Sequence, residues 1–189
     1  PWTIPSNKAV AYNKSISYGL YKVLKTEEEC WSKVDELLIF ADKLAAECLG
    51  QARVTDYERV STIGLNELKG LHLQHPLHGR AGSRGFWDYD VPMIDGEHVT
   101  EDAGTGFVHT APSHGADDYE AFVNLGWTNR MTHNIGEDSS FSDNVPFFSG
   151  LEVFDRKGKE GKANNSVIEK LIESGSLLAR GRLSHSYPH

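Results

Sequence analysis

The apolar residues of this chain fall into short runs that glycine, proline, asparagine and aspartate interrupt, and this pattern constrains the fold more than any other feature. Such runs suit many short strands with two or three helices. No run approaches the roughly 18 apolar residues of a membrane span. The pattern therefore predicts a mixed α/β domain, built on a twisted, barrel-like sheet with peripheral helices.

The boundaries of the predicted elements follow from their turn formers and caps. Strands are expected at 9–12, 16–23, 36–41, 53–63, 89–94, 98–100 and between Gly106 and Pro112. The turn at 13–15 predicts a hairpin of the first two strands, and Asp95-Gly96-Glu97 predicts a second hairpin. Helices are expected at 42–49, with Asp42 as N-cap and Gly50 just past the end, at 116–126 and at 165–174.

Length, charge and cysteine content narrow the class of protein. A chain of 189 residues fits one domain and can bury a core that needs no disulfide or metal. Only Cys30 and Cys48 are present, which excludes a Cys-rich zinc site and favours a reducing, cytoplasmic location. The net charge of −8 argues against broad binding to a phosphate backbone. Since Pro1 is not preceded by an initiator Met or a signal peptide, we expect 1–189 to be a single domain excised from a longer chain.

The densest group of functional residue types lies at 104–119, where a strand, a loop and a helix are expected to meet. A structural explanation accounts for several of them. Asp117 and Asp118 fall in a first helical turn, where carboxylates meet the positive end of the helix dipole. Adjacent helical residues point about 100° apart, so at most one of the two aspartates is expected to face a pocket. His109 on an apolar strand is by default a core histidine.

Metal binding is an alternative that histidine spacing raises. His72, His75 and His78 could supply imidazole ligands, as could His109 with His114 and an aspartate. No His-Glu-x-x-His or Cys-x-x-Cys spacing occurs, and Pro76 breaks the helix that would align the first group. We therefore predict no metal site. The sequence also lacks a dinucleotide-binding glycine loop and a Gly-x-Ser-x-Gly nucleophile motif.

Two segments that lie far apart in the sequence carry a family resemblance. They are Pro-Trp-Thr-Ile-Pro-Ser-Asn at 1–7 and Gly-Thr-Gly-Phe-Val-His-Thr-Ala-Pro-Ser-His-Gly-Ala-Asp-Asp-Tyr at 104–119. Together they resemble the editing domain of isoleucyl-tRNA synthetase, the connective-peptide insertion of this class I synthetase. Residues 145–151 and 185–189 extend the resemblance along the chain. The second segment alone would also suit valyl or leucyl relatives, and the opening segment points to the isoleucyl enzymes.

This resemblance implies a hydrolytic function and the editing-domain fold. The domain would cleave the ester of valyl-tRNA(Ile), and also valyl-adenylate, by attack of water. The implied partners are the 3′ end of tRNA(Ile) carrying valine and the rest of the parent synthetase, with no membrane. Editing would need no cofactor, since ATP and Mg²⁺ belong to the synthetic domain, which this chain lacks.

The resemblance also assigns roles to individual positions. Asp118 matches the carboxylate that binds the α-ammonium of the substrate. His109 matches the residue whose bulk excludes the extra methyl of isoleucine. Asn7 matches a pocket residue near the terminal adenosine or the attacking water. The remaining matches line the edge of the pocket: Trp2, Thr3, Thr110 and Tyr187.

One departure from the family bears on activity. In the family a run of threonines directly precedes Pro-Trp-Thr and lines the pocket, whereas this chain begins at Pro1. The fragment is therefore expected to hold an incomplete pocket. The alternative function is a non-catalytic, or truncation-disabled, aminoacyl-tRNA-binding module of the same fold.

Overall fold

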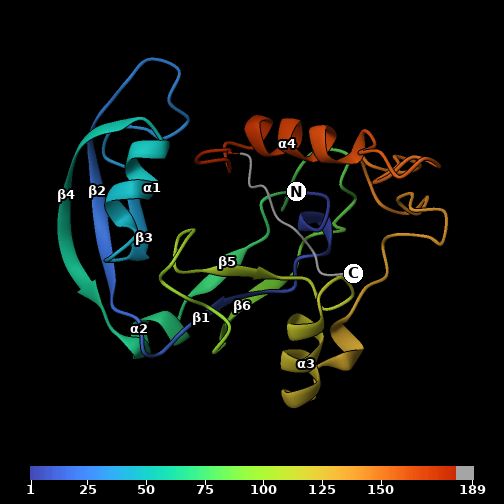
Figure 1. Cartoon of the computed structure of the whole chain (residues 1–189), viewed down its shortest axis with the longest axis horizontal. Coiled ribbons are helices and arrows are strands. Elements are labelled where there is room, and N and C mark those ends of the chain that lie inside the picture. The colour runs from blue at the N-terminus through green and yellow to red at the C-terminus, as the bar shows by residue number, and fades with distance from the viewer. Residues whose placement is uncertain (182–189) are drawn as a thin grey trace.

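The computed structural model describes residues 1–181, which form two β-sheets with α-helices packed around them (Figure 1). The strands are β1 (Ala9–Tyr12), β2 (Tyr18–Thr26), β3 (Leu37–Ala41), β4 (Val54–Ile63), β5 (His72–Gln74), β6 (Asp90–Asp95) and β7 (Val108–Thr110). The helices are α1 (Ala45–Gln51), α2 (Leu65–Lys69), α3 (Ala116–Asn124) and α4 (Ala163–Glu173), with 3-10 turns at Ile4–Ser6 and Thr128–Arg130. Tyr187 lies outside the described residues.

The two sheets differ in topology. One has the strand order β5-β6-β1-β7, in which β1 runs parallel to β6 and antiparallel to β7. The other is antiparallel with the order β3-β2-β4, and it lies with α1 to one side of the molecule (Figure 1). The mixed α/β class is thus confirmed. Within residues 1–181 the sheets do not close on themselves, so the description barrel-like holds only loosely.

Three hydrophobic clusters form the core. The first packs α1 against the three-stranded sheet, with Tyr18, Val23, Phe40 and Leu49 at its centre. The second lies under α4 and gathers the side chains Leu77, Trp87, Phe141, Phe148, Val167 and Leu171. The third packs Phe122 of α3 against the four-stranded sheet. The four-stranded sheet therefore positions the segment 108–118 at both ends. Its first residues form β7, a strand of this sheet, and its last residues begin α3, which packs on the sheet.

Both predicted hairpins are wrong. Strands β1 and β2 enter different sheets, because the turn between them is held against the end of β6: Asp95 Oδ1 accepts a hydrogen bond from Lys14 N at 3.1 Å, and Val99 O accepts one from Asn13 Nδ2 at 2.9 Å. After β6 the chain does turn, with Val99 N donating to Gly96 O at 3.1 Å. Residues 98–100 form no strand, and β6 pairs with β1 and β5 instead.

The helix predictions are confirmed in place, but α1 is corrected at both ends. Helix α3 ends before Gly126, and α4 ends before Gly175; both glycines have positive φ, of 70° and 69°. Helix α1 begins at Ala45 and contains Gly50, so Asp42 is not its cap. The reason is that the Asp42 carboxylate accepts hydrogen bonds from Ser17, Tyr21 and Arg59 in the sheet and cannot also bind a helix N-terminus.

Residues 1–181 contain no helix of the length and apolar character that crossing a membrane requires.

Candidate functional site

Pairing of β1 with β7 brings the two sequence motifs together. In this antiparallel pair Ala9 is opposite Thr110 and Val10 is opposite His109. The pairing continues past the strand, because Lys8 N donates to Thr110 O at 2.8 Å. The N-terminal arm, defined as residues 1–7, therefore lies directly beside His109 although about a hundred residues separate them in the sequence.

The His109 imidazole is held at both ring nitrogens by the N-terminal arm. Nε2 lies 2.9 Å from Thr3 Oγ1, and Nδ1 lies 3.3 Å from Asn7 Oδ1. The same Asn7 oxygen accepts the Thr110 backbone N–H at 3.2 Å, so it is an acceptor and His109 Nδ1 carries the proton. Burial lowers the pKa of His109, and the Asp118 carboxylate opposes this shift. The ring is thus a neutral, oriented group that accepts from the Thr3 hydroxyl.

Asp118 is the third residue of α3 and turns back over the loop that precedes the helix. Its Oδ2 accepts the backbone N–H of Ala111 at 2.8 Å. Among residues 1–181, Oδ1 of this carboxylate receives no hydrogen bond, and the side chain is only partly buried. One oxygen therefore fixes the orientation of the carboxylate. The other remains available to a cationic ligand, and the charge of the group reaches His109.

Aromatic side chains from the following segment hold the backbone of the arm. His75 Nε2 lies 2.9 Å from Ile4 O, Trp87 Nε1 donates to Pro5 O at 2.9 Å, and Tyr89 Oη donates to Asn7 O at 2.7 Å. His75 stacks on Trp87 with ring centroids 5.5 Å apart. These contacts replace water as partners of the carbonyl groups, so the arm keeps one conformation beside His109.

Sequence reasoning missed a second group of polar side chains under the arm. Ser6 Oγ lies 3.1 Å from His114 Nε2 and accepts from Asn134 Nδ2 at 2.9 Å. The His114 ring meets the Trp2 ring edge-on, with centroids 4.8 Å apart. Burial first, and then the neighbouring His133 and His109, lower the pKa of His114. His114 lies in the motif at 104–119, where the sequence suggested it only as a metal ligand. Ser6 lies in the motif at 1–7 without an assigned role, and no motif contains Asn134.

The structure brings together all the predicted site residues that it describes. Thr110 is fully buried, and its Oγ1 has no hydrogen-bond partner among residues 1–181. Trp2 is partly buried at the edge of the group, where its backbone N–H donates to Asn164 Oδ1 of α4 at 2.9 Å. Tyr187, the remaining predicted site residue, cannot be located.

The other aspartate of the pair faces elsewhere. Asp117 lines a cavity of about 590 Å³ together with Glu120, Asp95 and Lys69, and Asp118 does not line it. The two carboxylates thus point to different sides of α3, as the helical geometry predicts.

The histidines considered as metal ligands have separate partners. His72 Nδ1 lies 2.8 Å from Asp90 Oδ2, and His75 binds Ile4 O. No group of three or more potential metal-ligating side chains occurs within residues 1–181.

Comparison with known proteins was made by sequence and by structure. No family model matches the chain. Over its whole length the chain is 49% identical to the isoleucine–tRNA ligase of Ruegeria pomeroyi, 44% to that of Bradyrhizobium diazoefficiens and 45% to that of Caulobacter vibrioides. It spans about a fifth of the length of these relatives. The crystal structure of GlLeuRS-CP1 superposes on 66% of this chain and 41% of its own, with a TM-score of 0.50 and 21% identity.

The structural likeness shows the fold, which is that of GlLeuRS-CP1 and agrees with the expected editing-domain fold. The sequence relatives are more specific. Those named here are isoleucine–tRNA ligases, and this chain is similar over its whole length to a segment that makes up about a fifth of each.

Proposed function

We propose that this chain is an editing hydrolase that cleaves the ester of valyl-tRNA(Ile), and that it also hydrolyses valyl-adenylate. The observation that supports this most is the juxtaposition of a neutral imidazole, held at both nitrogens, with a carboxylate that keeps one oxygen free. The relatives whose sequences match are isoleucine–tRNA ligases, which is the setting in which such a reaction is needed.

The need for a second site follows from the size of a methylene group. A hydrophobic pocket distinguishes isoleucine from valine by only about 1–3 kcal/mol, and editing by this very synthetase is the standard illustration of the limit. A separate hydrolytic site must therefore admit valine and exclude isoleucine. In this proposal the His109 ring supplies the exclusion, because its position between Thr3 and Asn7 leaves it no freedom to move aside.

Hydrolysis of an aminoacyl ester requires no nucleophile from the protein, because the ester is already activated. The Asp118 Oδ1 atom would bind the α-ammonium group of valine through a charge-assisted hydrogen bond and so fix the ester. Asn7 engages its carbonyl oxygen with His109 and Thr110, which leaves its amide N–H groups for the terminal adenosine or the attacking water. Water then attacks the ester carbonyl, and positioning supplies much of the acceleration. Thr110, Trp2, Thr3 and Tyr187 would complete the wall of the pocket.

The partners follow from this reaction. They are the 3′ end of tRNA(Ile) carrying valine, valyl-adenylate and the remaining four fifths of the parent synthetase. We propose that editing uses no metal or other cofactor, and that ATP and Mg²⁺ serve only the synthetic domain of the parent. Valine release that persists in EDTA would support this, and its loss would contradict it. We place the parent enzyme in the cytoplasm, where translation occurs.

The variant Asp118→Asn tests the central role. The amide keeps an oxygen for the Ala111 N–H and removes only the charge, so the loop before α3 stays in place. A hydrogen bond to a charged group contributes about 1.5–3 kcal/mol, which predicts a loss of roughly 10- to 150-fold in kcat/KM for deacylation of valyl-tRNA(Ile). Asp117→Asn, on the other side of the helix, is the matched control and should retain full activity.

The alternative is a non-catalytic or truncation-disabled module. Measuring valine clearance by the chain and by its full-length parent distinguishes this alternative from an active hydrolase. If Asp118→Asn leaves valine clearance intact in the parent, the catalytic assignment fails. If Asp118→Asn abolishes valine clearance in the parent, the isolated wild-type chain is tested next. A chain that binds a non-hydrolysable valyl-adenosine analogue but does not hydrolyse the valyl ester is the disabled module.

A further inference from the structure

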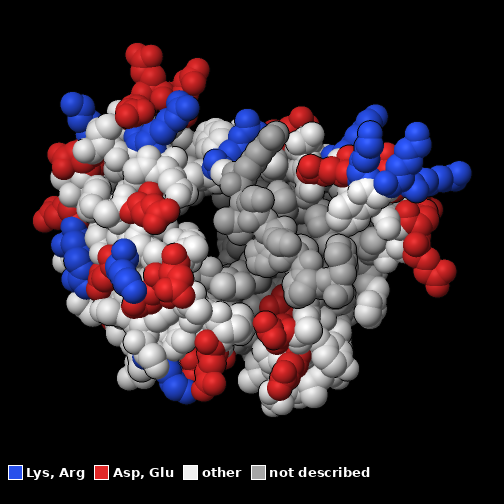
Figure 2. Space-filling model, in the orientation of Figure 1, with Lys and Arg blue, Asp and Glu red and all other residues white. Residues whose placement is uncertain are grey.

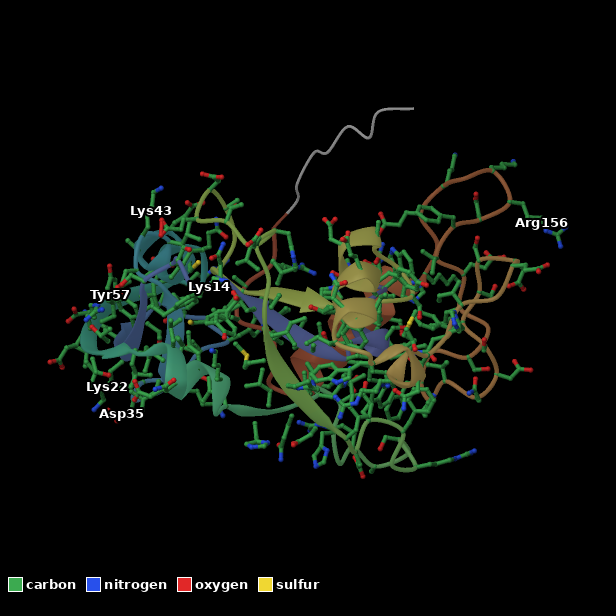
Figure 3. The ribbon with its side chains drawn as sticks, turned by 90° about the horizontal axis from the view of Figure 1, so that it is seen from below. Lys14, Lys22, Asp35, Lys43, Tyr57 and Arg156 are labelled. Atoms are coloured by element: carbon green, nitrogen blue, oxygen red, sulfur yellow. The ribbon has the colours of Figure 1, made fainter. Side chains whose placement is uncertain are left out.

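An exposed basic hairpin stands out on the acidic surface of this domain. It comprises residues 154–162, which connect Val153, a member of the second core cluster, to the start of α4. It carries four cationic and two anionic side chains, so its net charge is +2 on a chain whose total is −8. Figure 2 shows the corresponding blue cluster at one end of the molecule, and Figure 3 shows Arg156 projecting outward there, far from Lys22 and Lys43. The cationic members are Arg156, Lys157, Lys159 and Lys162.

The backbone of the basic hairpin is well ordered by its own hydrogen bonds. Phe154 bridges to Glu160, and Asp155 N donates to Lys159 O at 2.8 Å. The Asp155 carboxylate accepts the backbone N–H groups of Lys157 and Lys159, both at 2.8 Å. The hairpin therefore presents its cations from a fixed frame, and the carboxylate nearest to them is occupied by the turn.

The cations of the hairpin have no anionic partner within the described part of the chain. Elsewhere Lys14, Lys22, Lys43, Arg59 and others form ion pairs with carboxylates, and none of the four hairpin cations does. All four are exposed. The other anion of the hairpin, Glu160, is used by Asn164, whose Nδ2 donates to Oε1 at 2.8 Å. Three unpaired cations on the hydrogen-bonded turn, with a fourth at the start of α4, are suited to a polyanion.

The same Asn164 connects the hairpin to the candidate site. Its Oδ1 accepts the backbone N–H of Trp2, at the start of the arm that holds His109. Glu160 and Asn164 also line, with Pro1, a cavity of about 810 Å³. The base of the basic hairpin and the start of the N-terminal arm thus border one cavity, and the same arm holds His109.

We propose that the basic hairpin binds backbone phosphates near the 3′ end of the tRNA as its terminal adenosine enters the site. Phe154, which is 47% exposed beside the cations, supports a single-stranded nucleic acid over an acidic protein, because such strands are bound by cations combined with aromatic faces. The identity of the polymer rests on the proposed function; the presence of a polyanion site does not.

The test compares two variants of the whole chain that lose the same charge. One replaces the four hairpin cations with Gln. The control replaces four exposed lysines with Gln: Lys25 of β2, Lys33 of the loop that follows it, Lys43 before α1 and Lys69 of α2. These elements lie away from the segment before α4 that forms the hairpin (Figure 1). Binding of a fluorescent RNA minihelix that ends in single-stranded CCA is measured by anisotropy over a range of KCl concentrations. Each lost phosphate contact to a single strand lowers the slope of log K against log salt by about 0.7, so the hairpin variant should lose about 3 in slope and bind at least roughly tenfold more weakly at low salt.

The control variant should keep the wild-type slope. Equal losses in both variants, no loss in either, or a wild-type chain that does not bind the RNA would each overturn the proposal. Hydrolysis of valyl-adenosine, which carries no phosphate, is measured in parallel and should be unchanged in the hairpin variant. A wild-type chain that binds RNA through the hairpin but leaves valyl-adenosine intact would refute the proposed function and not the hairpin, so the two failures are distinct.

Discussion

His109 combines two roles that are usually separate, because it is a largely buried strand residue and also forms the wall of the proposed pocket. Its hydrogen bonds to Thr3 and Asn7 hold the imidazole in one orientation. We predict that His109→Ala admits isoleucine, so that isoleucyl-tRNA(Ile) is deacylated at a rate within about tenfold of the valyl ester. Parallel deacylation assays with the two esters measure this. Continued protection of isoleucyl-tRNA in a folded His109→Ala variant would refute a steric role.

His75 makes stability depend on pH. Burial lowers its pKa to about 4, from an ordinary value of 6.5. Between these values the unfolded chain binds a proton that the folded chain does not, so the free energy of unfolding must fall as the pH drops from about 6.5 toward 4, by up to about 3 kcal/mol. Urea unfolding at pH 7 and at pH 5 measures the loss. His75→Gln should flatten this dependence, and an equally steep profile in that variant would contradict the assignment.

At the residue scale, sequence reasoning found the groups that a motif carries and missed those that only tertiary structure defines. Asn7, His109 and Asp118 were predicted and do gather at one place. Ser6 and Asn134 were not: Ser6 lies in the motif at 1–7 but receives no role from the resemblance, and Asn134 lies in no motif and is defined only by its contact with Ser6. Their roles beside the site, like those of the predicted residues, stay predictions until variants are assayed.

Among the elements, the loop that precedes β7 contacts the three-stranded sheet, and a glycine allows this close approach. Gly106 has a φ of 83°, and a Cβ there would lie 2.4 Å from the Cβ of buried Ala41 in β3. Gly106→Ala should therefore lower the free energy of unfolding by about 2–5 kcal/mol, from backbone strain and overpacking together. Gly104→Ala is the matched control: its φ is 80°, but nothing lies within 4 Å of the added atom, so only about 1–2 kcal/mol is expected. Equal losses in chemical denaturation would contradict this account.

The elements also show where sequence patterns stop being informative. Positions of strands and helices depend on local periodicity, and β3, β4, α3 and α4 lie where the patterns put them. Strand partners depend on which apolar faces can be buried together. The predicted hairpins failed because β1 finds its partners in β6 and β7, more than eighty residues away, and not in the adjacent β2.

For the molecule as a whole, the net charge of −8 opposes RNA binding, and the basic hairpin, with a net charge of +2, is the region proposed to bind the RNA. We predict that the isolated chain binds uncharged tRNA(Ile) with a Kd weaker than about 1 µM at physiological salt, in the range of non-specific complexes. Affinity should rise as salt is lowered. Filter binding at several ionic strengths measures this, and submicromolar binding that is insensitive to salt would contradict it. That residues 1–189 act as a single domain also stays a prediction.

The pairing of β1 with β7 has a consequence for how the protein is made. When synthesis has reached residue 100 of this sequence, the N-terminal arm has been made, but β7, the strand that pairs beside it, has not. Until then the edge of β1 that pairs with β7 is unpaired, and His109 has not been synthesised. Under the proposed function, hydrolysis therefore requires residues as late as Asp118, and a nascent chain that ends before this residue should not deacylate valyl-tRNA(Ile).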